Sequence, residues 1–511
     1  MKTKFFSLIV LLAILITACQ PASAPTQIAM EPRREVTVVE TVEVVERPWA
    51  EPEPTAAAVG ENTYQDYGVN PPERTLYDHL STFALDVDTA SYAVHRRYIQ
   101  DGQLPPIEAV RAEEFINAFE QGYEPPASAA FTIYADGGPT PFTSDGSYFL
   151  RFGIQGYRVP DYARKPLALT FVIDVSGSMG MENRLGLVKR ALELLVEQLN
   201  REDTVAIVVY GSNARQVLDP TDGDQYREIM RAIDRLSPEG STNAEAGLRL
   251  GYRSAMTSYN PEASNRVILC SDGVANTGKT SADDILEMVA GYVAEGVDLT
   301  SVGFGMGNFN DVLLEQLAND GNGNYFYVDT LEAAEKVFDE DLTGTLQTIA
   351  YDAKAQVDFN PDVVAEYRLI GYENREIADQ QFRDDRVDAG EIGAGHTVTA
   401  LYQVKLLRGA DGRIATVQLR WQDAETREVR EINGNFNTWD LYASFEESDP
   451  RYQLAVLVSA YAEVLRASPY VDTNLGELAS LARYVARQLP EDMDVQELAD
   501  LVREAAWIAG E

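Results

Sequence analysis

The fold of this chain is decided by the stretch Leu167-Ala168-Leu169-Thr170-Phe171-Val172-Ile173, which runs straight into Asp174-Val175-Ser176-Gly177-Ser178. A strand this continuously apolar is typical of the middle of a parallel sheet that is covered on both faces. Ligands of open α/β sheets bind just beyond the carboxyl ends of such strands. The pattern therefore predicts that one carboxylate and two hydroxyls, those of Asp174, Ser176 and Ser178, stand together at the rim of the sheet. Such hard oxygen ligands select Mg²⁺, Mn²⁺ or Ca²⁺ over zinc or copper.

Two segments further along the chain complete this group of oxygen ligands. Gly240-Ser241-Thr242-Asn243 opens a predicted helix, and the buried strand Arg266-Val267-Ile268-Leu269-Cys270-Ser271 ends in Asp272-Gly273. With these segments, the chain resembles a von Willebrand factor type A domain with a complete metal-ion-dependent adhesion site, formed by Asp174, Ser176, Ser178, Thr242 and Asp272. The resemblance implies that the hydroxyls contact the metal directly and that the aspartates act largely through water. It also implies an open coordination position for an acidic side chain of a protein partner. Because two carboxylates match the charge of one divalent ion, we expect the metal to stay Lewis-acidic.

The alternative interpretation of the D-x-S-x-S run is a helix cap. Serine and aspartate are favoured at helix N-termini, and Arg184 to Leu199 has the apolar spacing of an amphipathic helix. Capping needs only one such residue, however, and does not require Thr242 and Asp272 further along the chain. The metal site is therefore the favoured interpretation.

Apolar strands and amphipathic helices alternate along the whole of residues 166–347, which we expect to form the von Willebrand factor type A domain. This alternation is typical of a doubly wound sheet, mostly parallel, with right-handed crossovers. The further predicted strands are Thr204–Tyr210, Ala214–Leu218, Asp298–Gly305 and Asn324–Val328, and the further predicted helices are Asp283–Glu295, Asn310–Ala318 and Leu331–Leu346.

The segments on either side of this domain resemble those of a family of predicted bacterial surface lipoproteins. The resemblance rests on Leu80–Tyr92, His95–Tyr98 and Glu113–Asn117 before the domain, and on Val364–Arg375 and Asp385–His396 after it. It implies a von Willebrand-associated domain over residues 75–160 and a C-terminal domain of β-strands and helices over 348–511, and it fixes architecture far better than function.

Strands with alternating polar and apolar residues occur on both sides of the predicted domain. They are Phe131–Ala135 and Tyr148–Gln155 before it, and Ala353–Phe359, Glu366–Tyr372, Thr397–Lys405 and Ala415–Trp421 after it. This alternation is typical of half-exposed antiparallel strands. We therefore expect the α/β domain to be inserted into one β-sandwich built from both flanks, followed by helices over Pro450–Ala467 and Val495–Ile508. Asp494, with Glu497 three residues later, resembles a capping box at the start of the last helix.

A second motif, D-x-D at Asp86 and Asp88, follows the apolar run Leu80 to Leu85. The same pattern holds the aspartyl nucleophile of haloacid-dehalogenase-type phosphatases, but the fifth position of that motif holds threonine or valine and is Ala90 here. The favoured interpretation is structural: a strand that ends at Asp86 and a helix capped by Asp88 or Thr89.

The first residues are typical of a lipoprotein signal. Two lysines precede the apolar run Phe5 to Ile16, which is too short to span a membrane, and Ile16-Thr17-Ala18-Cys19 resembles a bacterial lipobox. We expect residues 1–18 to be removed and Cys19 to be lipidated. Residues 19–74, rich in proline, alanine, glutamate and valine, are expected to be a disordered tether, although the valines at 36, 38 and 39 are also compatible with an edge strand.

Composition narrows the classes of partner and of activity. With 42 basic and 81 acidic residues, the chain has a formal net charge of −39, which argues against nucleic-acid binding. It also repels anionic headgroups, so the acyl chain at Cys19 must hold the protein to its membrane. The other cysteine, Cys270, lies in an apolar strand and is expected to be a buried thiol. His79, His95 and His396 form no zinc motif, and the sequence holds no nucleophile elbow, so we expect no enzyme.

Two classes of function remain. The first is a membrane-anchored, extracytoplasmic module that binds a protein ligand through a divalent metal. The second is a scaffolding or assembly subunit of a cell-envelope complex, in which the metal site serves docking within the complex. A metal-dependent hydrolase is a distant third. The sequence does not identify the partner.

Overall fold

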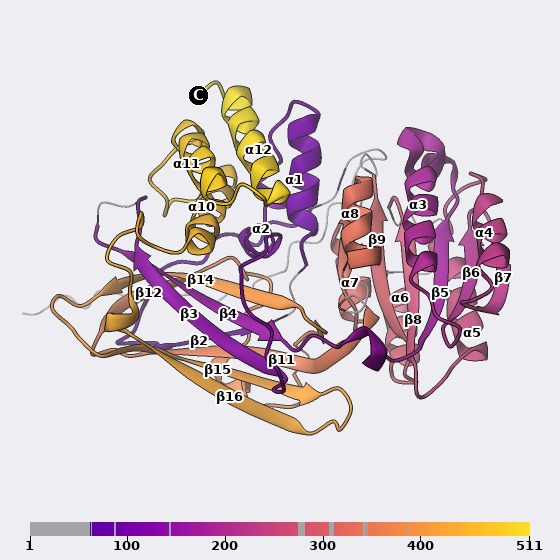
Figure 1. Ribbon diagram of the computed structural model, residues 1–511, viewed down its shortest axis with the longest axis horizontal. Helices are drawn as coiled ribbons and strands as arrows, with labels where there is room; N and C mark the ends of the chain where they lie inside the picture. Colours follow the sequence, from indigo (N-terminus) through magenta and orange to yellow (C-terminus); the bar gives the residue numbers. More distant parts are fainter. Residues whose placement is uncertain are drawn as a thin grey trace, which may run out of the picture. The chain divides into compact units, whose positions relative to one another are not determined.

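A six-stranded sheet contains the strand that ends in Asp174 (Figure 1). The strand order is β10-β9-β8-β5-β6-β7, and all neighbours pair in parallel except β6 and β7. The strands are β5 (Leu167–Asp174), β6 (Thr204–Tyr210), β7 (Ala214–Asp222), β8 (Ser264–Ser271), β9 (Asp298–Phe304) and β10 (Tyr325–Val328). All eight residues of β5 are buried because β5 lies inside the sheet. The predicted doubly wound α/β fold is confirmed.

Helices cover both faces of this sheet. They are α3 (Arg184–Glu197), α4 (Tyr226–Asp234), α5 (Ala244–Thr257), α6 (Ala282–Val293), α7 (Asp311–Asn319) and α8 (Leu331–Glu335). Successive side chains of a strand point to opposite faces. Phe171 and Ile173 of β5 accordingly pack in one core with α3, α4 and α8, and Val172 packs in another with α5, α6 and α7.

The last helix of this domain differs from the prediction. The segment predicted as one helix over Leu331–Leu346 is α-helical over Leu331–Glu335 and π-helical over Lys336–Glu340. Ala334 and Phe338 are both buried in the core beneath α3. The apolar spacing that predicts a helix is therefore kept, and such spacing alone does not distinguish an α turn from the wider π turn.

Two antiparallel sheets form a sandwich from both flanks of the α/β domain (Figure 1). One has the order β1-β12-β14-β4-β3, and the other has the order β13-β11-β15-β16, with β2 paired to β11. Their strands are β1 (Glu73–Arg74), β2 (Leu80–Ala84), β3 (Phe131–Pro139), β4 (Tyr148–Gly156), β11 (Thr348–Phe359), β12 (Val364–Ile370), β13 (Ile392–Gly393), β14 (Thr397–Leu406), β15 (Arg413–Asp423) and β16 (Val429–Asn437). β4 precedes the α/β domain and pairs with β14, which follows it, so the predicted insertion is confirmed.

Five helices pack together on the sandwich. They are α1 (Ala90–Gln100), α2 (Ala112–Asn117), α10 (Pro450–Leu465), α11 (Leu475–Gln488) and α12 (Met493–Ala509). Phe149 of β4 and Leu401 of β14 belong to the same buried core as these helices. The prediction of a capping box at Asp494 is wrong: α12 begins earlier, its N-cap is Asp492, and the Asp492 carboxylate accepts a hydrogen bond from the Val495 amide.

Short 3₁₀ turns connect several elements. They are η1 (Ile107–Ala109), η2 (Asp161–Ala163), η3 (Gly177–Asn183), η5 (Asp379–Gln381) and η6 (Thr438–Asp440). The structure is a computed structural model, and it describes residues 62, 64–85, 88–142, 145–273, 282–305, 311–340, 344, 346–387 and 389–511. The predicted signal segment, Cys19 and the valine run lie outside this part of the chain. Within it, no helix is long and apolar enough to cross a membrane.

Candidate metal-binding site

Asp174 is held by hydrogen bonds from two directions at the carboxyl end of β5. Its Oδ1 accepts a hydrogen bond from the Ser176 amide at 2.7 Å, and its Oδ2 accepts one from the Ser271 hydroxyl at 3.2 Å. Ser271 is the last residue of the neighbouring strand β8. The carboxylate is fully buried, so its orientation is fixed by its own loop and by the adjacent strand.

The loop after β5 lies between the end of β6 and the loop that carries Thr242. The Val175 amide donates to the Tyr210 carbonyl at 2.8 Å, and the Gly177 amide donates to the Gly240 carbonyl at 3.1 Å. Thr242, two residues beyond Gly240, is half-buried just before α5. Two segments that are more than 60 positions apart in the sequence thus meet at the same rim of the sheet.

The two serines of the motif lie side by side. The Ser176 and Ser178 hydroxyl oxygens are 3.0 Å apart, with Ser176 buried and Ser178 half-buried. Ser176 occupies the N-cap position of η3, yet its side chain makes no capping hydrogen bond. The helix-cap alternative therefore does not account for this side chain. Its hydroxyl instead faces Ser178, as ligands of one ion would.

Asp272 follows β8 and is also buried. Its Oδ2 accepts a hydrogen bond from the Arg184 guanidinium, with 2.7 Å between Nη1 and Oδ2. Arg184 is the first residue of α3 and is itself buried. Sequence reasoning missed both Arg184 and Ser271: an arginine at the start of an amphipathic helix and a serine at the end of a strand carry no distinctive signal by themselves.

Burial changes the proton affinity of the Asp174 carboxylate. The pKa of Asp174 is raised to about 7: burial is the main cause, hydrogen bonds from Ser176 and Ser271 oppose the rise, and the nearby negative charge of Asp272 contributes to it. Within the described part of the chain, Asp174 has no ion-pair partner. A buried carboxylate of this kind is stabilised by a cation.

The donor set fits a hard divalent cation. Buried carboxylates at the ends of β5 and β8 and a pair of hydroxyls 3.0 Å apart are all oxygen ligands, as Mg²⁺, Mn²⁺ and Ca²⁺ require. The structure brings the predicted residues Asp174, Ser176, Ser178 and Asp272 to one rim of the sheet and places the loop of Thr242 against Gly177. The assignment of a metal to them stays a prediction.

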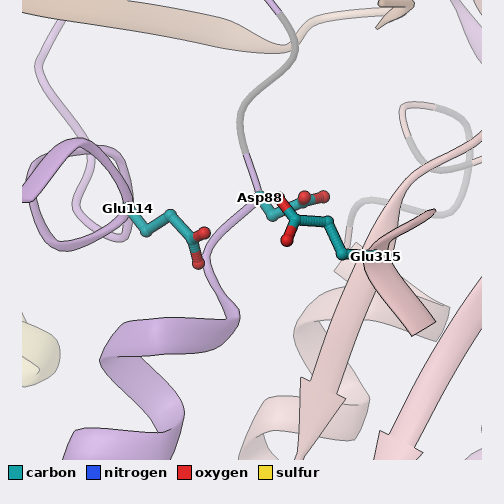
Figure 2. Close-up of side chains that lie close together, drawn as sticks. All are labelled: Asp88, Glu114 and Glu315. Carbon is teal, nitrogen blue, oxygen red and sulfur yellow. The ribbon is translucent and has the colours of Figure 1, made fainter. Parts of the chain in front are cut away.

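A second acidic cluster is formed by residues outside this group. Figure 2 shows Asp88, Glu114 and Glu315, each of which offers a carboxylate oxygen within 4.8 Å of the others. Two buried arginines enter the cluster. Arg111 contacts Glu114 at 2.8 Å and Glu315 at 2.9 Å, and Arg375 contacts Asp88 at 3.1 Å and Glu315 at 3.4 Å. The carboxylates therefore have protein cations as partners.

We call Asp88, Arg111, Glu114, Asp311, Glu315 and Arg375 the ionic junction. Asp311 and Glu315 belong to α7 of the α/β domain, Arg111 and Glu114 to the start of α2, and Arg375 to the segment after β12. Arg111 also contacts Asp311 at 2.6 Å, and the Tyr325 hydroxyl donates to Asp311 at 2.9 Å. The junction thus fastens the α/β domain to both flanking segments.

One member of the junction corrects a sequence prediction. Asp88 or Thr89 was expected to cap the helix that follows. In the structure, Thr89 is the N-cap of α1 but its side chain makes no capping bond, and Asp88 accepts a hydrogen bond from the Tyr325 amide at 2.9 Å. Asp88 is drawn away from the helix because its buried carboxylate pairs with Arg375. Asp86 lies outside the described residues.

Two residues with reactive side chains, His95 and Cys270, are buried. His95 is buried against the Tyr461 hydroxyl, 2.7 Å from its Nε2, and His79 Nδ1 lies 2.8 Å from a carboxylate oxygen of Asp358. Burial lowers the pKa of His95 to about 3. Cys270 is a buried free thiol, and burial raises its pKa to about 12. Neither His95 nor Cys270 is exposed for chemistry with an external ligand.

Comparison with known proteins gives a family for this arrangement. Residues 168–340 match the family described as von Willebrand factor type A domain, residues 58–149 the family von Willebrand factor, and residues 344–414 the family Uncharacterized protein YfbK, C-terminal. The chain is 35% identical over 435 residues to "Uncharacterized protein YfbK" of Escherichia coli (strain K12), and the aligned region covers 81% of this chain and 76% of that protein. The chain belongs to the YfbK family.

Other similar proteins share smaller parts of the sequence. "Uncharacterized protein sll0103" of Synechocystis is 24% identical over 323 residues, covering 61% of this chain and 74% of that protein. A solved structure described as von Willebrand factor type A from Catenulispora acidiphila is 16% identical, covers 72% of this chain and 89% of that chain, and has a TM-score of 0.43. The match of residues 168–340 to the family model shows that the YfbK-family chain carries a von Willebrand factor type A domain, a type that typically mediates protein–protein interaction or adhesion.

Proposed function

We propose that this protein is a membrane-anchored, extracytoplasmic module that binds a protein ligand through a divalent metal. The metal, Mg²⁺ or alternatively Mn²⁺ or Ca²⁺, is held by Asp174, Ser176, Ser178, Thr242 and Asp272. An acidic side chain of the ligand completes the coordination. Supplied with the metal, the site gains a Lewis acid that attracts a carboxylate from the partner.

The observation that carries the proposal is the side-by-side placement of the Ser176 and Ser178 hydroxyls in the loop that follows the buried carboxylate of Asp174. The Asp174 carboxylate positions the loop through the Ser176 amide, so that both hydroxyls stay at the rim. Gly177, half-way between the serines, ties the same loop to the Thr242 segment through the Gly240 carbonyl. Four oxygen-bearing side chains, and the loop that carries the fifth, Thr242, thus lie at one place, as an ion with several ligands requires.

Metal binding is tested by calorimetry with Mg²⁺ and Mn²⁺ on the purified protein. We expect Asp174→Ala and Thr242→Ala each to abolish binding while the circular dichroism of the fold persists. Asp219→Ala, an exposed aspartate on β7, and Ser241→Ala, an exposed hydroxyl beside Thr242, are matched controls that should bind like wild type. Unchanged affinity in both site variants would refute the metal assignment.

Partner binding is tested by capture from envelope extract in Mg²⁺ and in EDTA. A protein that is retained only in Mg²⁺, and that Asp174→Ala fails to retain, supports the proposal. Retention that is equal in Mg²⁺ and EDTA contradicts it. A partner that belongs to envelope machinery identifies the protein as a scaffolding or assembly subunit, and a matrix or host protein identifies it as an adhesion module.

The anchor rests on the sequence Ile16-Thr17-Ala18-Cys19 after a short apolar run. We expect Cys19→Ser to release the protein from the membrane fraction or to leave its signal segment uncleaved. Incorporation of labelled palmitate, lost in Cys19→Ser, is the direct measurement. Labelling that survives this substitution would contradict the lipid anchor without affecting the metal site.

A further inference from the structure

Arg184 is a buried cation at the candidate metal-binding site that the motif does not include. Its side chain is 5% exposed and its partner Asp272 is 2% exposed, and 2.7 Å separate Arg184 Nη1 from Asp272 Oδ2. The two residues are 88 positions apart in the sequence. A buried, short, charge-assisted contact of this kind is among the stronger polar interactions in proteins.

A glycine at the end of a strand leaves room for the side chain of Arg184. Gly305 follows β9 with a φ of +81°, and a Cβ at this position would lie 2.3 Å from Arg184 Nε and 2.6 Å from Arg184 Cδ. Only a residue without a side chain therefore leaves room for the arginine. Arg184 leaves the start of α3, passes against Gly305 at the carboxyl end of β9, and reaches Asp272 at the end of β8.

We infer that Arg184 is an internal counter-cation of the proposed metal site. By neutralising Asp272, it reduces the charge that the site presents from two negative charges to one, that of Asp174. The sequence alone indicated that the two carboxylates match a divalent ion, and this contact changes that balance. The inference rests on the proposed function, because it concerns how strongly the same five residues hold their metal.

A divalent ion in such a site keeps a net positive charge. It is therefore bound weakly by the protein alone and attracts a further carboxylate, which only a partner supplies. Arg184 thereby favours an exchangeable metal and an acidic ligand over a permanently bound ion. Two like charges a few ångströms apart at a protein surface repel strongly enough to change an equilibrium constant by more than about tenfold. We therefore expect Arg184 to lower the affinity for a divalent metal by at least about tenfold.

The test compares Mn²⁺ affinity, measured by calorimetry on the full chain, in wild type, Arg184→Gln and Arg184→Lys. Arg184→Gln should bind Mn²⁺ at least about tenfold more tightly, and Arg184→Lys, which keeps the charge, should remain close to wild type. Arg190→Gln is the matched control: Arg190 lies on the exposed side of α3, so its loss changes net charge equally but should leave affinity unchanged.

A second measurement needs no metal. Thermal unfolding in EDTA compares wild type with Arg184→Gln, Asp272→Asn and the double variant. The losses of unfolding free energy should be strongly non-additive: the double variant should lose less than the sum of the two single losses. Additive losses would overturn the inference.

The outcomes separate the two claims. If wild type binds Mn²⁺ and Arg184→Gln binds it equally or more weakly, Arg184 is a packing residue and the inference is wrong, while the proposed function stands. If wild type binds no Mn²⁺, both the proposed function and this inference fail.

Discussion

Arg111 is the residue on which the ionic junction depends most. It contacts Glu114, Asp311 and Glu315 at 2.6 to 2.9 Å, and its guanidinium lies 5.8 Å from the centre of the Tyr67 ring. Arg111→Met keeps much of the stem's packing and removes the charge. The four buried carboxylates of the junction would then be left with one of its two arginines, Arg375, which contacts Asp88 and Glu315.

Removing one partner from a buried ion pair costs about 3–5 kcal/mol, because the remaining charge stays desolvated. Glu114 is 0% exposed and the side chains of Glu315 and Asp311 are 5% and 8% exposed, so this range applies without a discount for solvent. Folded proteins are stable by about 5–15 kcal/mol. The substitution should therefore remove a large share of the free energy of unfolding.

The loss should also depend on pH. Burial raises the pKa of Asp311 to about 6, with Glu315 and Glu114 raising it and Arg111 lowering it, so the loss of Arg111 raises it further. A carboxyl group whose folded pKa lies above its unfolded value stabilises the fold at low pH, and this stabilisation is lost as pH rises through the folded pKa. Arg111→Met should thus be more destabilised at pH 8 than at pH 5.

Urea unfolding followed by circular dichroism at both pH values measures this. Arg249→Met on α5 is the matched control, since its exposed ion pair with Glu245, at 3.2 Å, contributes at most about 0.5 kcal/mol. Adding Glu114→Gln and Glu315→Gln to Arg111→Met should recover part of the loss, because fewer unpaired charges remain. A loss below about 1 kcal/mol, or one that is equal at pH 5 and pH 8, would refute the reasoning.

Further predictions concern single buried positions. Burial lowers the pKa of His95 to about 3, so between pH 6.5 and 3 the unfolded chain binds a proton that the folded protein does not. The free energy of unfolding should therefore fall by up to about 5 kcal/mol over this range. Measured by urea unfolding, it should depend less on pH in His95→Gln. Cys270 should resist alkylation in the native protein and react only when it unfolds, as peptide mass mapping can check. Gly251→Ala in α5 would place its Cβ 2.2 Å from a Val172 methyl and should cost about 1–3 kcal/mol of stability. Gly291→Ala in α6, whose Cβ would meet nothing within 4 Å, should stabilise the protein by up to about 1 kcal/mol. Thermal unfolding measures both, and equal effects of the two substitutions would contradict the packing argument.

The α/β domain could be predicted because its signals are local. The eight residues of β5 are apolar in a continuous run, and the D-x-S-x-S run follows at once. The insertion could be predicted because alternating strands occur on both flanks. By contrast, β16 and α11 were not predicted. β16 is an edge strand whose residues are mostly exposed, and the buried side of α11 contains three alanines, whose small side chains give a weak apolar pattern.

The charged contacts could not be predicted for a different reason. The ionic junction joins residues from α2, α7 and the segment after β12, and each is an ordinary charged residue in its own segment. Arg184 and Asp272 are likewise 88 positions apart. Sequence spacing reports which residues share a face of one element, but not which charges are buried together between elements. Asp88 is an example: its local sequence predicts a helix cap, but in the structure its carboxylate pairs with the distant Arg375.

The insertion of one domain into the sandwich also determines the order in which the two can fold during synthesis. Gln155 of β4 donates a hydrogen bond to the carbonyl of Gly395, just before β14, and these residues are 240 positions apart. At a synthesis rate of about 5–20 residues per second, β4 emerges roughly 10 to 50 seconds before its partner strand exists. During that interval β3 and β4 form at most a hairpin with an unpaired edge. The α/β domain, whose described strands pair only with one another, can complete its sheet in the same interval. On the ribosome, the inserted domain is thus expected to be finished before the sandwich that holds it.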